Sequence, residues 1–240
     1  MRVAQRVWLT PAYLLHQYAY RDTSRIAEVF TREHGRLSLF ARGVRAPKSA
    51  LRAVLRPFQR LLLSWTGKSE AGQLTAAEID GVFTQLPSQR LMSGFYVNEL
   101  LLKLTERWDS HPELFDWYEQ TVAGLAGAGE EEPHLRRFEK RLLEELGYGT
   151  DFSSTETGET VSLEHHYRVR PQRAVMRCEA GTAEAVPGRS LLELSAESFE
   201  NTATLRDAKR ILRASIEACL DGRSLGSREV MMALHRREQA

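Results

Sequence analysis

The residues most suited to binding chemistry lie in one short segment, residues 41–60, with the sequence ARGVRAPKSALRAVLRPFQR. This basic segment contains no Asp or Glu, and its cations are Arg42, Arg45, Lys48, Arg52, Arg56 and Arg60. Crowded cations repel one another and stay hydrated unless a polyanion lies against them. The segment therefore predicts a nucleic-acid-binding surface. The alternative is a solvated, arginine-rich face that only aids solubility.

The formal net charge of +1 for the 240 residues hides an uneven distribution of charge. Residues 1–80 carry 13 Lys and Arg against 6 Asp and Glu, which gives +7, and the other residues carry 20 against 26, which gives −6. A basic N-terminal part joined to an acidic C-terminal part suggests that the two parts meet different partners.

The composition is that of an ordinary soluble globular protein, with 42% hydrophobic and 27% charged residues. The N-terminus has no apolar run of signal-peptide length, and no window approaches the roughly 20 apolar residues of a membrane span. We therefore expect a cytoplasmic protein with no membrane partner. The two cysteines, Cys178 and Cys219, lie far apart outside any CxxC motif, which argues against a disulfide framework or a cysteine-rich zinc site.

The elements that must position the basic segment are short strands, separated by turn residues such as Gly35, Gly67 and Gly72. Apolar or alternating runs occur at residues 13–20, 26–31, 37–41, 58–65 and 74–79. Five such strands in about 70 residues fit a small closed barrel such as an OB-fold. We therefore predict an N-terminal OB-fold over residues 1–83. The basic segment connects its third and fourth strands, at the rim of the barrel.

After Pro87 the apolar spacing changes to that of helices. We expect helices over residues 88–107, 134–146, 189–194, 205–220 and 227–237, and one that begins after Ser110. Ser110 and Glu113 have the spacing of a capping box, Pro133 suits the first turn of the third helix, and Gly147 suits its end. The predicted class is thus α+β: the barrel, then a mainly α-helical domain over residues 84–240. Residues 150–187 interrupt this domain as an irregular or hairpin excursion.

Aromatic side chains accompany the cations of the predicted barrel. Single-strand binders stack bases on aromatic rings, and each stack contributes roughly 1–3 kcal/mol whatever the base. Most of the rings must fill the barrel, so we expect at most one or two of Tyr18, Tyr20 and Phe58 to face a ligand.

The helix over residues 134–146 has a basic face. Its cations, Arg136, Arg137 and Arg141 with Lys140, recur beside apolar residues, a combination that suits an acidic peptide with an apolar end. The alternative is that these cations pair internally, with Glu139, Glu144 and the acidic linker.

No catalytic residue, metal site or cofactor is predicted. His165 and His166 with Cys178 are imaginable as a metal site, but adjacent residues on a strand point to opposite faces, and an exposed His pair in a loop is the better interpretation. Phosphate-binding loops of Walker type, nucleophile elbows and HExxH motifs are missing from the sequence. A metal-dependent nuclease that uses His165 or His166 is therefore the weakest hypothesis, and an RNA-binding OB-fold module is the main alternative to DNA binding.

Several blocks of sequence, in order, resemble the bacterial recombination mediator proteins of the RecO family. They are HGRLSLFARGVRAPKS, PFQRLLLSWTGKSE, GFYVNELLLKL, HPELFDWYE, LRRFEKRLLEELGYG, and AKRILR followed by SLGSREV. The resemblance covers nearly the whole chain, from about residue 13 to about residue 234.

The resemblance implies an OB-fold, a helical domain and no turnover of a small substrate. It also implies binding of single- and double-stranded DNA, annealing of complementary strands in the nucleoid, and action with RecR to load recombinase onto strands coated by single-stranded-DNA-binding protein. The acidic C-terminal tail of that coating protein is a further implied partner. We assign it to Arg136, Arg137 and Arg141.

By position, the DNA-binding residues implied by the resemblance and by charge are Arg32, Arg36, Arg42, Arg45, Lys48, Arg52 and Arg56. Many family members carry two cysteine pairs as a zinc site in the excursion, whereas residues 150–187 here contain only Cys178. This chain therefore resembles a zinc-free branch, whose excursion must be held by packing and hydrogen bonds. Residues 1–11 also extend beyond the family pattern.

Overall fold

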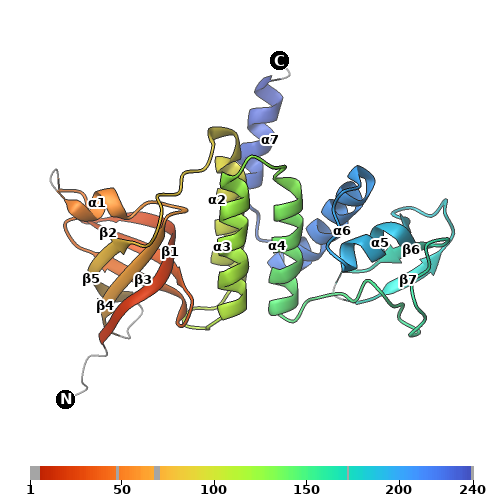
Figure 1. The fold of residues 1–240 in the computed structure, drawn as a ribbon, viewed down its shortest axis with the longest axis horizontal. Coiled ribbons are helices and arrows are strands. Elements are labelled where there is room, and N and C mark those ends of the chain that lie inside the picture. The colour runs from red at the N-terminus through yellow and green to blue at the C-terminus, as the bar shows by residue number, and fades with distance from the viewer. Residues whose placement is uncertain (1–5, 47–48, 68–70, 172, 239–240) are drawn as a thin grey trace. The chain divides into compact units, whose positions relative to one another are not determined.

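The computed structural model describes residues 6–46, 49–67, 71–171 and 173–238. Contacts divide the chain into two compact units, one formed by residues 1–129 and 225–240 and the other by residues 130–224. The first unit holds the strands of the barrel, a short helix and three long helices, and the second holds the helices between residues 132 and 220 and a small sheet (Figure 1).

Alternating apolar residues fold the N-terminal part into a closed barrel with the strand order β1-β2-β3-β5-β4 (Figure 1). The strands are β1 (Arg6–Tyr20), β2 (Ser24–Thr31), β3 (Gly35–Ala41), β4 (Arg60–Thr66) and β5 (Ala71–Ile79). All pairings are antiparallel except that of β3 with β5. One side chain in two points inward, and the interior contains Val29, Leu39, Leu63 and Trp65, all buried. The predicted OB-type barrel is confirmed.

Strand β1 begins at Arg6, seven residues before the start that the apolar pattern predicts. Its first residues pair with β4, from Arg6 opposite Thr66 to Ala12 opposite Leu61, with a shift in register between Val7 and Thr10. The side chain of Trp8 points outward and is 60% exposed, and the Arg6 guanidinium lies 4.5 Å from its ring centroid. The first residues of β1 are mostly exposed and do not alternate between apolar and polar. The apolar pattern therefore underestimates the length of the strand.

Three long helices complete the first unit: α2 (Leu91–Leu104), α3 (Pro112–Ala126) and α7 (Gly226–Glu238). The 3-10 turn η1 (Ser88–Arg90) precedes α2. Buried polar contacts join these helices to the barrel: Tyr118 of α3 donates to Asn98 Oδ1 of α2 at 2.8 Å, and Asn98 donates to the Leu15 carbonyl of β1 at 3.0 Å.

The predicted capping box at the start of α3 does not form. His111 is the N-cap and makes no side-chain capping bond, whereas the Ser110 hydroxyl donates to the carbonyl of Arg32 at 3.2 Å. The hydroxyl serves a tertiary contact with the β2–β3 turn instead.

The second unit contains α4 (Glu132–Glu145), α5 (Gly188–Ser195) and α6 (Thr202–Leu220). Pro133 lies in the first turn of α4, and Gly147 ends the helix region with φ +77°, as predicted. The excursion forms a three-stranded sheet in the order β7-β6-β8, with β6 (His166–Val169), β7 (Val175–Cys178) and β8 (Val186–Pro187). Buried apolar residues and a hydrogen bond of 2.8 Å from the Ser162 amide to the Tyr167 hydroxyl hold it together.

Candidate nucleic-acid interface

The basic segment forms the β3–β4 connection, as predicted, and contains a short helix, α1 (Ala50–Val54). The first residues of the segment, which precede α1, lie against the β1–β2 turn. The amide of Arg45 donates to the Thr23 carbonyl at 2.9 Å, and the Arg45 Nη1 donates to the Arg21 carbonyl at 3.4 Å. These bonds place two loops from different parts of the barrel at one rim.

Five exposed arginines belong to these two connections, and we call them the arginine rim: Arg21, Arg42, Arg45, Arg52 and Arg56. None of the five pairs with a carboxylate among the residues that the structure describes. The predicted Lys48 lies outside the described residues. Arg21 was missed because the polar β1–β2 turn carries an acid beside it, and only the folded turn places it against the basic segment.

Arg32, at the β2–β3 turn, is exposed but already paired. Its Nε and Nη2 donate to the two carboxylate oxygens of Asp116 in α3, at 3.0 and 2.8 Å. The hydrogen bond from Arg32 lowers the pKa of Asp116 below its ordinary value. The carboxylate of Asp116 thus largely neutralises the positive charge of Arg32.

Arg36 is a structural residue rather than a surface cation. Its Nη1 lies 3.4 Å from Glu28 Oε2, and its Nη2 donates to the Thr105 carbonyl at 2.8 Å. Burial lowers the pKa of Arg36, an effect that Glu28 partly offsets. The guanidinium holds the end of α2 against β2 and β3, so its placement does not favour a phosphate contact.

Arg60, the last cation of the basic segment, is also paired. It donates to Asp80 at 2.7 Å and forms a second ion pair with Glu119 of α3. The sequence brings six cations together, but the fold removes this one from the exposed set.

The three aromatic candidates have different surroundings. Phe58 is 4% exposed and packs against Phe95 at 5.2 Å between ring centroids, so of the three candidates it is the one that does not face a ligand. Tyr18 is 50% exposed, and Tyr20 is partly exposed with the Arg21 guanidinium 5.3 Å from its ring centroid.

A groove of about 600 Å³ lies beside the ring of Tyr18, within the first unit. Strands β1 to β3 form one wall, and α2 with the start of α7 forms the other. Its lining includes Tyr18, Phe95 and Arg107. Arg107 also donates to Glu28 Oε1 at 2.8 Å, so two guanidinium groups share one buried carboxylate.

Comparison with known proteins identifies the barrel and the helical part. The family model described as "Recombination protein O N terminal" matches residues 2–83, and the model described as "Recombination protein O C terminal" matches residues 88–229. The prediction that residues 1–11 extend beyond the family pattern is therefore wrong, since the first match begins at residue 2. The chain belongs to the RecO family. It is similar to the "DNA repair protein RecO" of Thiobacillus denitrificans, at 42% identity over 92% of this chain and 90% of the relative. It is also similar to the proteins of that name from Chromobacterium violaceum, at 40% over 95% and 96%, and Azoarcus sp., at 41% over 98% and 99%.

In this RecO-family chain, the arginines that were predicted to bind a partner meet acids within the second unit. Arg136 is 4% exposed and lies 3.1 Å from Glu139. Arg137 and Arg141 both reach Glu197, at 3.2 and 2.7 Å. This placement favours the alternative that these cations pair internally. One of the acids, Glu197, lies outside α4 and was not among the partners predicted from the sequence.

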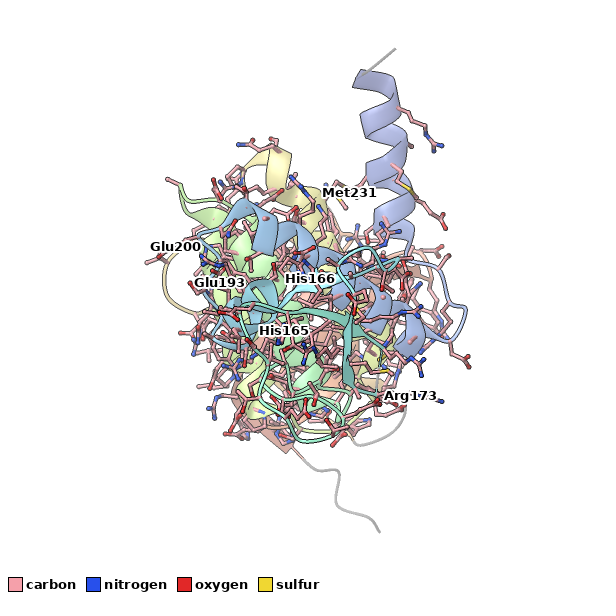
Figure 2. All side chains as sticks on the ribbon, turned by 90° about the vertical axis from the view of Figure 1, so that its right-hand side faces the viewer. His165, His166, Arg173, Glu193, Glu200 and Met231 are labelled. Atoms are coloured by element: carbon pink, nitrogen blue, oxygen red, sulfur yellow. The ribbon has the colours of Figure 1, made fainter. Side chains whose placement is uncertain are left out.

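The His pair lies at the start of β6, the central strand of the small sheet, and Figure 2 labels both residues. His166 begins β6 rather than lying in a loop, and it stands opposite Cys178 of β7. Within the described ranges, no group of three or more His, Cys, Asp or Glu side chains is placed to hold a metal ion. In the same ranges, no helix is long and apolar enough to cross a bilayer.

Proposed function

We propose that this RecO-family chain is a DNA-binding recombination mediator in DNA repair, which anneals complementary single strands and helps load recombinase onto strands coated with single-stranded-DNA-binding protein. The observation that carries the proposal is the arginine rim: five exposed cations on a closed barrel, with no carboxylate partner among the described residues. The relatives' shared name, DNA repair protein, agrees with a DNA ligand.

The mechanism requires binding and no chemical turnover. Two single strands repel each other through their phosphates, and arginines that neutralise phosphates on both strands lower this barrier. Base pairing then supplies the sequence match. Arg42 and Arg45 suit the task because they lie together at the rim, whereas Arg32 and Arg36 are engaged by Asp116 and Glu28.

The test is annealing of two labelled complementary oligonucleotides, with and without a coat of single-stranded-DNA-binding protein, over a series of salt concentrations. We expect acceleration that survives the coat and weakens as salt rises. The double variant Arg42→Ala/Arg45→Ala should lose most of the acceleration. Arg206→Ala/Arg213→Ala, which removes two exposed arginines from α6, is the control of equal charge.

Each outcome decides something. Acceleration of naked strands alone would remove the mediator role, and no acceleration would overturn the proposal. Tighter binding of an RNA oligonucleotide of the same sequence would favour an RNA-binding module instead.

We also propose RecR and the acidic C-terminal tail of the coating protein as partners. The tail suits the cations of α4, although it must compete there with Glu197, which Arg137 and Arg141 already contact. A tail peptide should bind Arg137→Ala/Arg141→Ala more weakly than the natural chain in fluorescence anisotropy. Unaltered affinity would exclude this site.

A further inference from the structure

We propose that a segment of the chain itself, residues 197–199, occupies the basic face of α4 as an internal pseudo-ligand. An acidic peptide with an apolar end then binds there only by displacing this segment, which has the sequence ESF and which we call the ESF segment. The proposal rests on the partner site proposed above and adds its regulation. It concerns the second unit alone, which contains both α4 and the connection between α5 and α6.

The carboxylate of Glu197 is the point at which three cations of α4 meet. Its Oε1 lies 2.7 Å from Nη2 of Arg141 and 3.0 Å from Nζ of Lys140, and its Oε2 lies 3.2 Å from Nε of Arg137. Arg137 also donates from Nη2 to the backbone carbonyl of Glu197 at 3.3 Å. The basic face of α4 thus binds both the side chain and the main chain of this one residue.

The ESF segment has the chemistry of the peptide that suits this face. Phe199 follows Glu197 by two positions and is buried, and the guanidinium of Arg137 lies 5.6 Å from the centroid of its ring. One arginine therefore meets an anion through an ion pair and an aromatic ring through a cation–π contact. An external acidic peptide with an apolar end needs the same contacts, so the peptide and the segment exclude each other.

The backbone of the ESF segment is strained at Glu197. Helix α5 ends in a turn in which the amide of Glu197 donates to the Leu194 carbonyl at 3.2 Å, and the amide of Ser198 donates to the Glu193 carbonyl at 2.9 Å. Glu197 has φ +56° in this turn, the left-handed conformation that glycine usually supplies at the end of a helix. A glutamate costs conformational energy there, and its ion pairs offset that cost. Because the strain is relieved when the segment leaves, displacement costs less than the ion pairs alone suggest.

The cations of this site remain within reach of a ligand. The side chains of Arg137 and Arg141 are 31% and 36% exposed, whereas that of Glu197 is 11% exposed. A pocket of about 320 Å³ lies at Lys140, and its lining includes the ring of Phe152. An incoming anion therefore contacts the exposed guanidinium atoms before the ESF segment has left, and the pocket offers space for the apolar end of the peptide.

The alternative is that the ESF segment is only a structural contact between α4 and the α5–α6 connection. Both interpretations predict that loss of the Glu197 carboxylate weakens the second unit, since its cations lose a partner. Only the pseudo-ligand predicts that the same loss strengthens the binding of an external peptide. Peptide affinity therefore separates the two.

The experiment measures, by fluorescence anisotropy, how tightly the full chain binds a labelled probe peptide of three aspartates followed by a C-terminal phenylalanine. Glu197→Gln removes the internal negative charge and keeps the size of the side chain. Its affinity for the probe should exceed that of the natural chain by about fivefold or more, the lower end of the usual coupling between sites. If Glu197→Gln does not fold, Glu197→Gly removes the same carboxylate and suits the φ of +56°.

Two control variants separate displacement from a general gain in positive charge. Glu144→Gln removes another carboxylate that contacts Lys140 and Arg141, at 3.0 and 3.1 Å, but this residue belongs to α4 and does not leave the site. It should raise the affinity for the probe less than Glu197→Gln does. Glu200→Gln removes an exposed acid of the α5–α6 connection and should leave the affinity unchanged. Equal gains for Glu144→Gln and Glu197→Gln would overturn the proposal, because charge alone would then account for both.

Hydrogen exchange of the natural chain reports displacement directly. Saturation with the probe should speed the exchange of the Glu197 and Ser198 amides, because release of the ESF segment breaks their bonds to the carbonyls of Leu194 and Glu193. Unchanged protection at saturation would show that the peptide binds without moving the segment, and this result would also overturn the proposal.

The outcomes distinguish failure of this proposal from failure of the partner site. If the probe binds neither the natural chain nor Glu197→Gln, the partner site on α4 fails, and the pseudo-ligand fails with it. If the probe binds both equally and Arg137→Ala/Arg141→Ala abolishes binding, the partner site stands and internal competition is wrong. Tighter binding by Glu197→Gln, together with faster exchange in the natural chain, supports the pseudo-ligand.

Discussion

Glu99 of α2 accepts two hydrogen bonds from Ser227 of α7 on one carboxylate oxygen: from the backbone amide at 2.9 Å and from the hydroxyl at 2.6 Å. The other oxygen accepts the amide of Gly226 at 2.9 Å. A single carboxylate thus satisfies two of the four amides that are left free at the start of a helix. These bonds join residues that are separated by 127 and 128 positions in the sequence. They attach the last helix to the rest of the first unit.

This attachment should depend on pH. Burial alone would raise the pKa of Glu99, but the hydrogen bonds from Ser227, Gly226 and Lys103 prevail and lower it below its ordinary value of 4.5. A group whose pKa is depressed on folding contributes stability above its unfolded pKa and loses it as the pH falls through the folded value. We therefore expect amide protection factors in α7 to stay constant from neutral pH to about 4.5 and to fall below it.

Glu99→Gln is the matched control, because a carboxamide has one acceptor oxygen and does not titrate. Its α7 amides should be less protected at neutral pH and should show no step on acidification. Amides of α3 report general unfolding of the unit. Equal protection in the variant and the natural chain would show that Glu99 does not hold α7.

Gly35→Ala should destabilise the first unit severely. Gly35 has φ +62°, and an added Cβ would lie 1.7 Å from the carbonyl oxygen of Asp109. The clash is with backbone and cannot be relieved by a side-chain rotation, so we expect a loss of about 4 kcal/mol or more in the free energy of unfolding. Urea denaturation measures it.

Gly43→Ala separates the clash from the backbone strain. Gly43 has a similar φ of +66°, but an added Cβ would meet no atom within 4 Å. It should cost about 1–2 kcal/mol. Equal losses at the two positions would mean that the contact with Asp109 is not tight.

The salt dependence of single-strand binding should distinguish free from paired arginines. Replacing Arg42, Arg45 and Arg52 together by Ala should flatten the slope of log affinity against log salt by up to about 2, since each phosphate contact contributes roughly 0.7. Arg32→Ala should leave the slope nearly unchanged, because Asp116 already neutralises that guanidinium. A larger change for Arg32 than for the rim would move the DNA path to the β2–β3 turn.

Glu197→Ala should destabilise the second unit. Its carboxylate lies 3.0 Å from Lys140, a side chain only 8% exposed, and also contacts Arg137 and Arg141. Its loss leaves three neighbouring cations without this carboxylate. We therefore expect the free energy of unfolding, measured by thermal denaturation, to fall by roughly 3 kcal/mol.

The matched control for this variant is Glu200→Ala, an exposed acid of the same loop that Figure 2 labels. This substitution should lower the free energy of unfolding by less than about 0.5 kcal/mol. If the two variants are equally stable, the cations of α4 do not depend on Glu197.

The sequence by itself determined the elements whose signals are local. Alternating apolar residues predicted the barrel, helical spacing predicted the main helices, and Pro133 and Gly147 marked the start and end of α4. The basic segment was visible for the same reason, since its cations are neighbours in sequence. These signals come from the period of the side chains and from backbone preferences, which need no distant partner.

Only the tertiary structure decided which cations remain available. Arg32 meets Asp116 across 84 positions, and Arg137 meets Glu197 across 60. The start of β1 likewise depends on its pairing with β4. Whether a charge is free depends on which opposite charge the fold brings within about 4 Å, where Coulomb attraction is strong, and that distance is unrelated to separation along the chain.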